Sequence, residues 1–302
     1  MKELSIIIPH YNNWEMLVQL LDTIPTIDGI ETIVIDDHSY NQKERLPKIK
    51  AEYPEVIFEI NEENKKGAGT ARNTGLSLAT GKWLLFADSD DLFLEHFYET
   101  IEPYFYTDFD LIYFKPFSFI ENSSIESKRH VPYEKYILEY LNNYSKKKEM
   151  RLRYKFLPPW SKLIRHSVVK DNNIKFEEVM YSNDVLFSAK VGYYSKNIAA
   201  DDEIIYKIRE RDGSLTSTLD EDKYIRRFDA WLDYVIFLKQ NLSSEEYAYL
   251  NISIVPQLIT LIRNQLGAKN IINIMIKSKK NNIAWFDKRL LNPIFIIKSL
   301  KK

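Results

Sequence analysis

The chain has 302 residues, of which 45% are hydrophobic and 28% charged, so it is long enough to bury about three quarters of its unfolded surface as a globular protein. Its formal net charge of -1 at pH 7 argues against a general nucleic-acid binder. It contains no cysteine, which excludes disulfides and thiolate metal sites and suits a reducing cytoplasm, and no apolar run reaches the roughly 18 to 20 residues of a membrane span.

Strand and helix patterns alternate over the first hundred residues. The first strand, residues 4–8, is closed by Pro9 and is too short an apolar run for a signal peptide. The alternation predicts a parallel sheet with right-handed crossovers. Further strands are expected at residues 32–35, 56–60 and 83–87, and helices at 14–24, 43–53 and 70–79.

Polar side chains follow three of these strands at their carboxyl ends. They are His10-Tyr11-Asn12, Asp36-Asp37 and Asp88-Ser89-Asp90-Asp91. Open α/β sheets bind ligands at this edge, so the pattern predicts a nucleotide site. Two carboxylates about 4 Å apart repel by roughly 4 kcal/mol at an effective dielectric near 20, and Mg²⁺ or Mn²⁺ would relieve that cost. The alternative is an acidic turn in which Asp91 caps a helix beginning near Leu94.

Other residues near this edge have chemistry that suits a nucleotide. Asp36 or Asp37 could accept a hydrogen bond from the ring N–H of uracil, thymine or guanine, and Tyr11 could stack on the base. Arg72 is expected in the first turn of its helix, where a cation opposes the helix dipole, and a diphosphate would satisfy both. A solvated turn, an exposed tyrosine and a solvated arginine remain the alternatives.

The middle of the chain is less regular. Residues 109–114 predict a strand, whereas residues 117–155 show no clean period and are interpreted as acceptor-side insertions. The basic run 146–155 could meet an anionic acceptor or form a solvated face. A helix is expected to begin at residues 160–164, Asp184 to start another helix as a possible N-cap, and a strand pair to span 198–208.

Four ordered motifs resemble those of glycosyltransferase family 2. This resemblance extends over residues 1–218 and implies a GT-A fold, a nucleotide-sugar donor, a divalent metal and inversion at the anomeric carbon. The segments are 5–12 (SIIIPHYN), 34–39 (VIDDHS), 69–75 (GTARNTG) and 88–91 (DSDD), with weaker matches at 160–163 (WSKL), Phe176, 183–187 (NDVLF) and 213–216 (GSLT).

The resemblance also implies roles for individual residues. Pro9, Tyr11, Asp37 and Arg72 would hold the nucleotide, which by family habit is UDP. Asp88 and Asp90 would hold ribose and the metal, Mn²⁺ or Mg²⁺, with Asp91 able to replace one of them.

On the acceptor side, the resemblance makes Asp184 the catalytic base. Inverting transfer needs one base near the attacking hydroxyl, while a metal stabilises the departing diphosphate. The family often has Glu before this Asp, whereas this chain has Asn183. Trp160 would offer an apolar face to a sugar ring, and Arg211 and Ser214, in the loop 209–216, would close over the diphosphate.

Residues 219–302 lie outside the resemblance. Apolar residues at helical spacing predict packed helices at 224–238 and 247–266, and residues 263–302 hold ten Lys or Arg against the single acid Asp287. This basic end could lie on an anionic membrane surface or dock on protein.

The sequence therefore predicts an α/β protein with a mostly parallel, Rossmann-like GT-A sheet flanked by helices and a C-terminal helical extension. Residues 1–218 are expected to form the catalytic domain, with a nucleotide-sugar part at about 1–115 and an acceptor part at about 116–218, and residues 219–302 to form the extension.

The predicted function is metal-assisted, inverting transfer of a sugar from a nucleotide donor to a hydroxyl of a growing surface polysaccharide or lipid-linked glycan. The expected location is cytoplasmic, with contact at the inner face of the membrane left open. The alternatives are a non-catalytic sugar-nucleotide-binding partner subunit and a sugar nucleotidyltransferase, although the latter would need a glycine-rich loop where Pro9-His10-Tyr11-Asn12 stand.

Overall fold

The computed structural model describes residues 2–62, 66–123, 125–211 and 220–287. The chain divides into two compact units, Met1–Arg211 and Asp212–Lys302. The boundary expected at residue 218 falls within residues 212–219, outside the described part.

The first unit is built on one eight-stranded sheet with the strand order β3-β2-β1-β4-β7-β6-β8-β5. Four of the seven strand pairings are parallel, namely β1 with β2 and β4, β2 with β3, and β6 with β8, while the other three are antiparallel. The mostly parallel α/β sheet is thus confirmed, with the antiparallel pairings confined to β5 and β7. The strands are β1 (Leu4–His10), β2 (Ile30–Asp36), β3 (Ile57–Ile60), β4 (Trp83–Phe86), β5 (Leu92–Phe93), β6 (Leu111–Ile120), β7 (Lys162–Arg165) and β8 (Ile198–Glu210).

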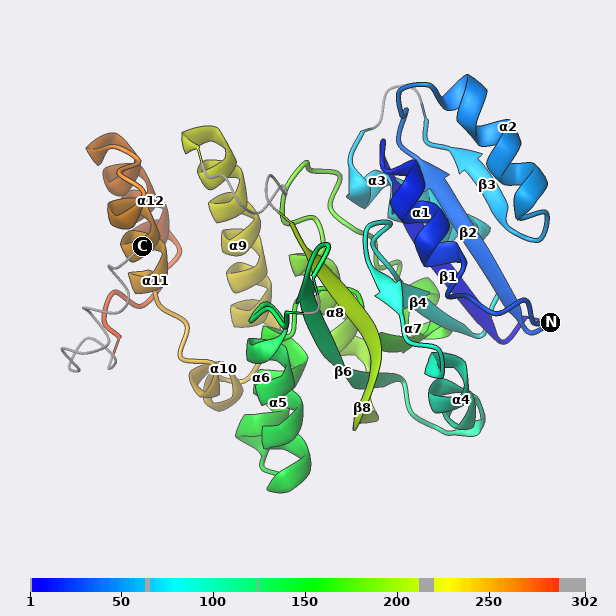
Figure 1. Cartoon of the computed structure of the whole chain (residues 1–302). Helices are drawn as coiled ribbons and strands as arrows, with labels where there is room; N and C mark the ends of the chain where they lie inside the picture. Colours follow the sequence, from blue (N-terminus) through cyan, green and yellow to red (C-terminus); the bar gives the residue numbers. More distant parts are fainter. Residues whose placement is uncertain (1, 63–65, 124, 212–219, 288–302) are drawn as a thin grey trace. The chain divides into compact units, whose positions relative to one another are not determined.

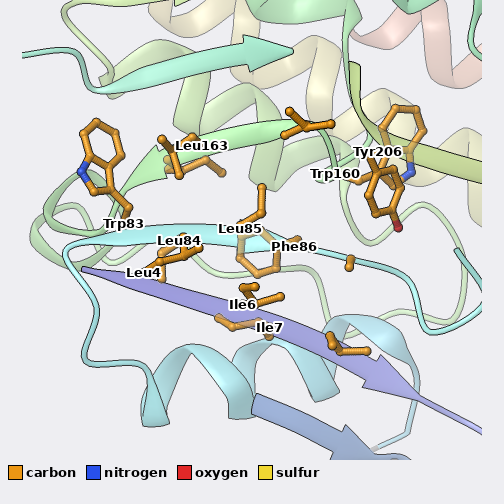
Figure 2. Packing of buried hydrophobic residues seen from close by; sticks show 14 of the residues in the cluster. Leu4, Ile6, Ile7, Trp83, Leu84, Leu85, Phe86, Trp160, Leu163 and Tyr206 are labelled. Carbon is orange, nitrogen blue, oxygen red and sulfur yellow. The ribbon is translucent and has the colours of Figure 1, made fainter. Parts of the chain in front are cut away.

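The central strands are apolar because both of their faces are covered. Every residue of β1, β2 and β4 is buried. Figure 2 shows Ile6 and Ile7 of β1 beside Leu84 and Leu85 of β4, with Leu163 of β7 next to them. Such two-sided burial is typical of parallel strands and explains their continuous hydrophobic runs.

Helices surround this sheet, and Figure 1 shows α1, α2 and α3 around β1, β2 and β3. Gly75 of α3 lets this helix approach β1 closely, because a Cβ at Gly75 would lie 2.5 Å from Ile7 Cγ2. The helices are α1 (Trp14–Leu21), α2 (Gln42–Glu52), α3 (Ala68–Leu78), α4 (Phe97–Ile101), the 3₁₀ helix η1 (Glu102–Tyr106), α5 (Val131–Asn142), α6 (Lys146–Lys155), α7 (His166–Asp171) and α8 (Val185–Tyr194).

The structure corrects three expectations for the middle of the chain. The helix expected at residues 160–164 is wrong, because Lys162–Arg165 form β7 between β4 and β6. The strand pair expected at 198–208 is the single strand β8, which pairs with β6 through irregularities near Lys115. Residues 117–155, which show no clear period in sequence, continue β6 and then form α5 and α6.

The second unit is helical over its described residues, as predicted. Its helices are α9 (Glu221–Asn241), α10 (Ser244–Tyr249), α11 (Val255–Arg263) and α12 (Ala268–Lys280). An ion pair of 2.5 Å between Lys277 Nζ and Asp229 Oδ1 joins α12 to α9. Within the described residues, none of the helices has the length and apolar character needed to cross a membrane. Most of the basic end, residues 288–302, lies outside the described part.

Candidate functional site

The polar groups predicted to meet at one sheet edge do meet there. In the parallel register His10 lies opposite Asp36, and the Asp37 N–H donates to the His10 carbonyl at 2.8 Å. β4 lies on the other side of β1, and the Ala87 N–H donates to the Ile7 carbonyl at 3.2 Å. Tyr11, Asp37 and Asp88 therefore leave three neighbouring strands on the same edge.

Asp36 is part of the scaffold of this edge. Its carboxylate lies 2.8 Å from His10 Nδ1 and accepts from the Ser39 hydroxyl at 2.5 Å and the Ser39 N–H at 3.0 Å. Burial alone would raise the pKa of Asp36, but the hydrogen bonds from His10 and Ser39 hold that pKa below its usual value. Of the two acids considered for base recognition, Asp36 is buried and fully hydrogen-bonded, which leaves Asp37 nearer the solvent.

Asp37 also fixes the start of α3. Its carboxylate accepts from the Gly67 N–H at 2.7 Å and from Asn61 Nδ2 at 2.9 Å. Tyr11 lies beyond it with 48% of its surface exposed, next to the exposed Tyr40, with ring centroids 6.2 Å apart. The Tyr11 ring is thus accessible to a flat ligand, whereas Pro9 is buried within β1.

Arg72 connects the loop after β4 with the segment before α8. It lies in the second turn of α3, since the helix begins at Ala68, so the expected first-turn position is wrong. Its guanidinium donates to Asp88 Oδ1 at 2.5 Å and to Asn183 Oδ1 at 2.8 Å, and it packs over the Phe176 ring. With 5% of its surface exposed, Arg72 is a buried cation held by one carboxylate and one amide.

This bridge explains how Asn183 fits where the family often has Glu. The amide oxygen of Asn183 accepts from Arg72 without adding a second negative charge beside Asp88. The same contact brings Asp184, the next residue, to the edge that carries the acids. Asn183 and Phe176 are site residues whose partners no spacing in the sequence could identify, because the contacts span 111 residues in one case.

Asp88 and Asp90 are both partly exposed, with 31% and 30% of their side chains accessible. Arg211 Nη2 lies 3.3 Å from Asp90 Oδ2, so each of the two acids has its own arginine. Burial raises the pKa of Asp90, the charge of Asp88 raises it further, and Arg211 opposes both effects. The two carboxylates therefore interact electrostatically on one open loop.

Asp91 has a different environment from the other two acids. It is 3% exposed, accepts from the Tyr206 hydroxyl at 2.9 Å and from the Arg209 N–H at 2.7 Å, and thereby ties the acidic loop to β8. Burial first, and then the charges of Asp90 and Asp88, raise the pKa of Asp91 well above its usual value. It does not cap a helix near Leu94, since β5 follows it and α4 begins only at Phe97.

Asp184 directly precedes α8 at the N-cap position, but its carboxylate makes no capping hydrogen bond. The described residues of α8 receive no side-chain capping bond from it, so the carboxylate is available for another role. Burial raises the pKa of Asp184 and the Arg72 cation opposes that rise. This is the behaviour expected of a partly desolvated carboxylate beside a fixed cation.

The remaining predicted residues are less accessible or lie outside the described part. Trp160 is 2% exposed and stacks with Tyr206 at a centroid distance of 5.9 Å, so its ring packs against protein in this structure. Ser214 lies within residues 212–219, outside the described part. No group of three or more His, Cys, Asp or Glu side chains placed to hold a metal ion occurs in the part of the chain that the structure describes.

The geometry agrees with what comparison with known proteins finds. The family model "Glycosyl transferase family 2" matches residues 5–172. The chain belongs to glycosyltransferase family 2. It is an enzyme of the glycosyltransferase class, and its sheet has the GT-A fold.

Individual relatives give the same result. The poly(ribitol-phosphate) beta-N-acetylglucosaminyltransferase TarP of Staphylococcus aureus is 31% identical over 230 residues, which cover 74% of this chain and 67% of TarP. A crystal structure of Staphylococcus aureus TarS 1-349 with UDP-GlcNAc has a TM-score of 0.69 and 20% identity, covering 92% of this chain and 80% of its own. A mannosyltransferase of Pyrobaculum calidifontis with GDP-Man and Mn²⁺ has a TM-score of 0.57 and 13% identity, covering 98% of this chain and 85% of its own. In three other curated relatives the aligned part spans only 33% to 37% of their length.

Proposed function

We propose that this chain is a metal-assisted, inverting glycosyltransferase that moves a sugar from a UDP-activated donor to a hydroxyl of a growing surface polysaccharide or lipid-linked glycan. The observation that carries the proposal is the Arg72 bridge. One buried guanidinium holds Asp88, on the donor side, and Asn183, next to Asp184, at the same edge of the sheet. A donor bound at Asp88 and an acceptor deprotonated by Asp184 would meet there.

Donor recognition is assigned to the residues after β1 and β2. The exposed Tyr11 ring offers a stacking surface for the base. The Asp37 carboxylate is closer to solvent than that of Asp36, and each of its oxygens keeps a lone pair beside the bonds from Asn61 and Gly67, so it would accept from the ring N–H of uracil. Pro9 would support this segment through the backbone of β1 rather than by its own side chain. The likeness to the N-acetylglucosaminyltransferase TarP and to the TarS structure with UDP-GlcNAc supports testing UDP-GlcNAc first among nucleotide sugars.

The metal is assigned to Asp88 and Asp90. Carboxylate oxygens suit Mg²⁺ or Mn²⁺, and these two side chains are partly exposed on one loop. Bound there, the ion would stabilise charge on the departing diphosphate. Asp91 is less suited, because both of its oxygens accept hydrogen bonds from Tyr206 and Arg209.

Asp184 is assigned as the general base. As the acceptor oxygen bonds to the anomeric carbon and the bond to the diphosphate breaks on the opposite face, the hydroxyl proton passes to the Asp184 carboxylate. The raised pKa of Asp184, caused mainly by burial, makes it a stronger base than a solvated carboxylate. Arg72 and Arg211, which pair with Asp88 and Asp90, would supply positive charge beside the diphosphate.

The acceptor and the place of reaction follow from the same proposal. A polymer on a lipid carrier would be extended at the cytoplasmic face of a membrane, and the basic end of the chain would contact its anionic lipids. Binding of the protein to vesicles with and without anionic lipid tests the membrane contact. We expect binding only to the anionic vesicles, and equal binding to both kinds, or to neither, would contradict this contact.

Thermal stabilisation by nucleotides tests the donor assignment. UDP or UDP-GlcNAc at about 100 times its dissociation constant should stabilise the protein by roughly 2.7 kcal/mol. We expect this effect with Mn²⁺ in the wild type and not in Asp90→Ala. A lack of stabilisation by any nucleotide, with or without metal, would overturn the donor assignment.

Turnover tests the base and the alternatives. Asp184→Asn should bind UDP as the wild type does and lose transfer. If both the wild type and Asp184→Asn bind the nucleotide but neither transfers sugar, the chain would be better explained as a non-catalytic partner subunit. Formation of a nucleotide sugar from UTP and a sugar phosphate would favour the nucleotidyltransferase.

A further inference from the structure

A buried lysine that no step above uses lies beneath the helix that carries Asp184. Lys162, on β7, is 2% exposed, although lysine is rarely buried without an acid partner. Its Nζ donates to the Phe156 carbonyl at 2.5 Å and to Ser188 Oγ at 3.2 Å. The same nitrogen lies 5.0 Å from the centre of the Phe156 ring and 5.6 Å from that of Tyr113.

These contacts place Lys162 under the first turn of α8. Ser188 is one helical turn after Asp184, and its N–H donates to the Asp184 carbonyl at 2.9 Å. The ammonium thus holds the beginning of the helix through a hydroxyl and holds the segment before β7 through a carbonyl. Both acceptors are neutral, and no carboxylate within the described ranges lies within 4.0 Å of this nitrogen.

The charge that acts on Lys162 is that of the Asp184 carboxylate. Burial lowers the pKa of Lys162 to about 7, and the Asp184 carboxylate is the group that opposes this fall. In turn, burial raises the pKa of Asp184, and Lys162 is one of the cations that lower it. A lysine with a pKa near 7 carries a positive charge on the acidic side of neutrality.

We propose that Lys162 is a positioning residue for the catalytic base, fixing the first turn of α8 through Ser188 and supplying, together with Arg72, positive charge beside the Asp184 carboxylate. This inference rests on the proposed role of Asp184. A neutral side chain at this position would leave the helix in place through packing, but the carboxylate would be easier to protonate. Asp184 would then be protonated, and unable to accept the proton of the acceptor hydroxyl, over a wider range of acidic pH.

Among the described residues, four groups on the surrounding elements interact electrostatically with Asp184, and their effects must be separated in any pH experiment. Arg72 of α3 and Lys162 of β7 favour its ionised form, whereas Asp88, after β4, disfavours it. The fourth is Tyr133 of α5, whose pKa is raised to about 12 by burial and by the charge of Asp184. Tyr133 therefore stays neutral over the working range, and among these described neighbours Lys162 is the one whose pKa lies near neutrality.

The pH dependence of transfer tests the charge. We expect Lys162→Met to lose activity roughly tenfold on the acidic limb of the pH–rate profile and little on the plateau, where Asp184 is ionised in both proteins. Ser188→Ala is the matched control, because it removes one hydrogen bond of Lys162 and keeps the ammonium, so its acidic limb should stay in place. If the lysine has only a structural role, both Lys162→Met and Ser188→Ala should be less stable than the wild type, and the acidic limb of the pH–rate profile should move in neither.

A second measurement does not depend on turnover. In protein labelled with ¹³C at the lysine ε position, the Lys162 signal, assigned by its absence in Lys162→Met or, if that variant does not fold, in Lys162→Gln, should titrate near pH 7. In Asp184→Asn the same signal should titrate at lower pH, since the opposing charge is gone. An unchanged titration in Asp184→Asn overturns the proposal, whereas an Asp184→Asn protein that still transfers sugar overturns the base assignment instead.

Discussion

The hydroxyl of Tyr206 is expected to hold the acidic loop in place, and Tyr206→Phe removes that hydroxyl alone. In the wild type it accepts from the Asp88 N–H at 2.8 Å and donates to Asp91 Oδ2 at 2.9 Å. Losing the bond to Asp91 costs about 1 kcal/mol, and leaving the Asp88 N–H without a partner costs about 1 to 2 kcal/mol more. For a folding unit of this size, a total of about 2 to 3 kcal/mol lowers the melting temperature by roughly 4 to 12 °C.

Tyr113→Phe is the matched control for this prediction. Tyr113 and Tyr206 are both fully buried, on the neighbouring strands β6 and β8. The Tyr113 hydroxyl has no hydrogen-bond partner among the described residues, so its removal should leave the melting temperature unchanged or raise it. Calorimetry of the three proteins decides the matter. Equal melting temperatures for the two variants would refute the assignment of Tyr206 as the anchor of the loop.

Two further changes test the packing and the charge of the site. Gly69→Ala should lower the free energy of unfolding by about 1 to 3 kcal/mol and reduce transfer, because the added Cβ would collide with the Glu177 carbonyl and with Asn183 Cβ. Gly29→Ala is the control and should change neither, because nothing lies within 4 Å of a Cβ at that position. Equal stabilities of the two variants in urea unfolding would contradict this prediction. Burial raises the pKa of Asp91 in the folded state, so above about pH 4 the folded protein still binds a proton that the unfolded chain has released. The free energy of unfolding therefore falls as the pH rises from about 4 toward the raised pKa of Asp91. Asp91→Asn should therefore gain stability relative to the wild type as pH increases, and a difference that is constant with pH would count against a raised pKa.

The sheet edge could be predicted from sequence because its cause is local. An apolar strand buried on both faces must end where the chain returns to solvent, and in a parallel sheet those ends share one edge. The apolar runs before His10, Asp37 and Asp88 were therefore enough to bring these residues together. Their partners were not predictable in the same way, since Arg72 meets Asn183 through contacts made only in the folded chain.

The failed expectation at residues 160–164 has a physical reason. Pro158-Pro159 suggest the start of a helix at this point, yet here Lys162 is buried and strand β7 inserts between β4 and β6. A buried ammonium satisfied by a carbonyl and a hydroxyl carries no signature in sequence. The same holds for Asp91, which looks like a third ligand in a row of acids and is instead bonded to Tyr206 and Arg209.

The acidic cluster also shows why crowding of carboxylates is incomplete evidence for a metal. Asp88 pairs with Arg72 and Asp90 with Arg211, so two arginines balance two of the charges that would otherwise require a cation. A metal requirement would then come from the diphosphate of the donor, which brings its own negative charge, and not from the stability of the loop. We therefore expect EDTA to leave the melting temperature of the unliganded protein unchanged while it abolishes stabilisation by UDP. A fall in the melting temperature of the unliganded protein on chelation, reversed by Mn²⁺ and absent in Asp90→Ala, would show instead that the loop needs the ion to stay folded.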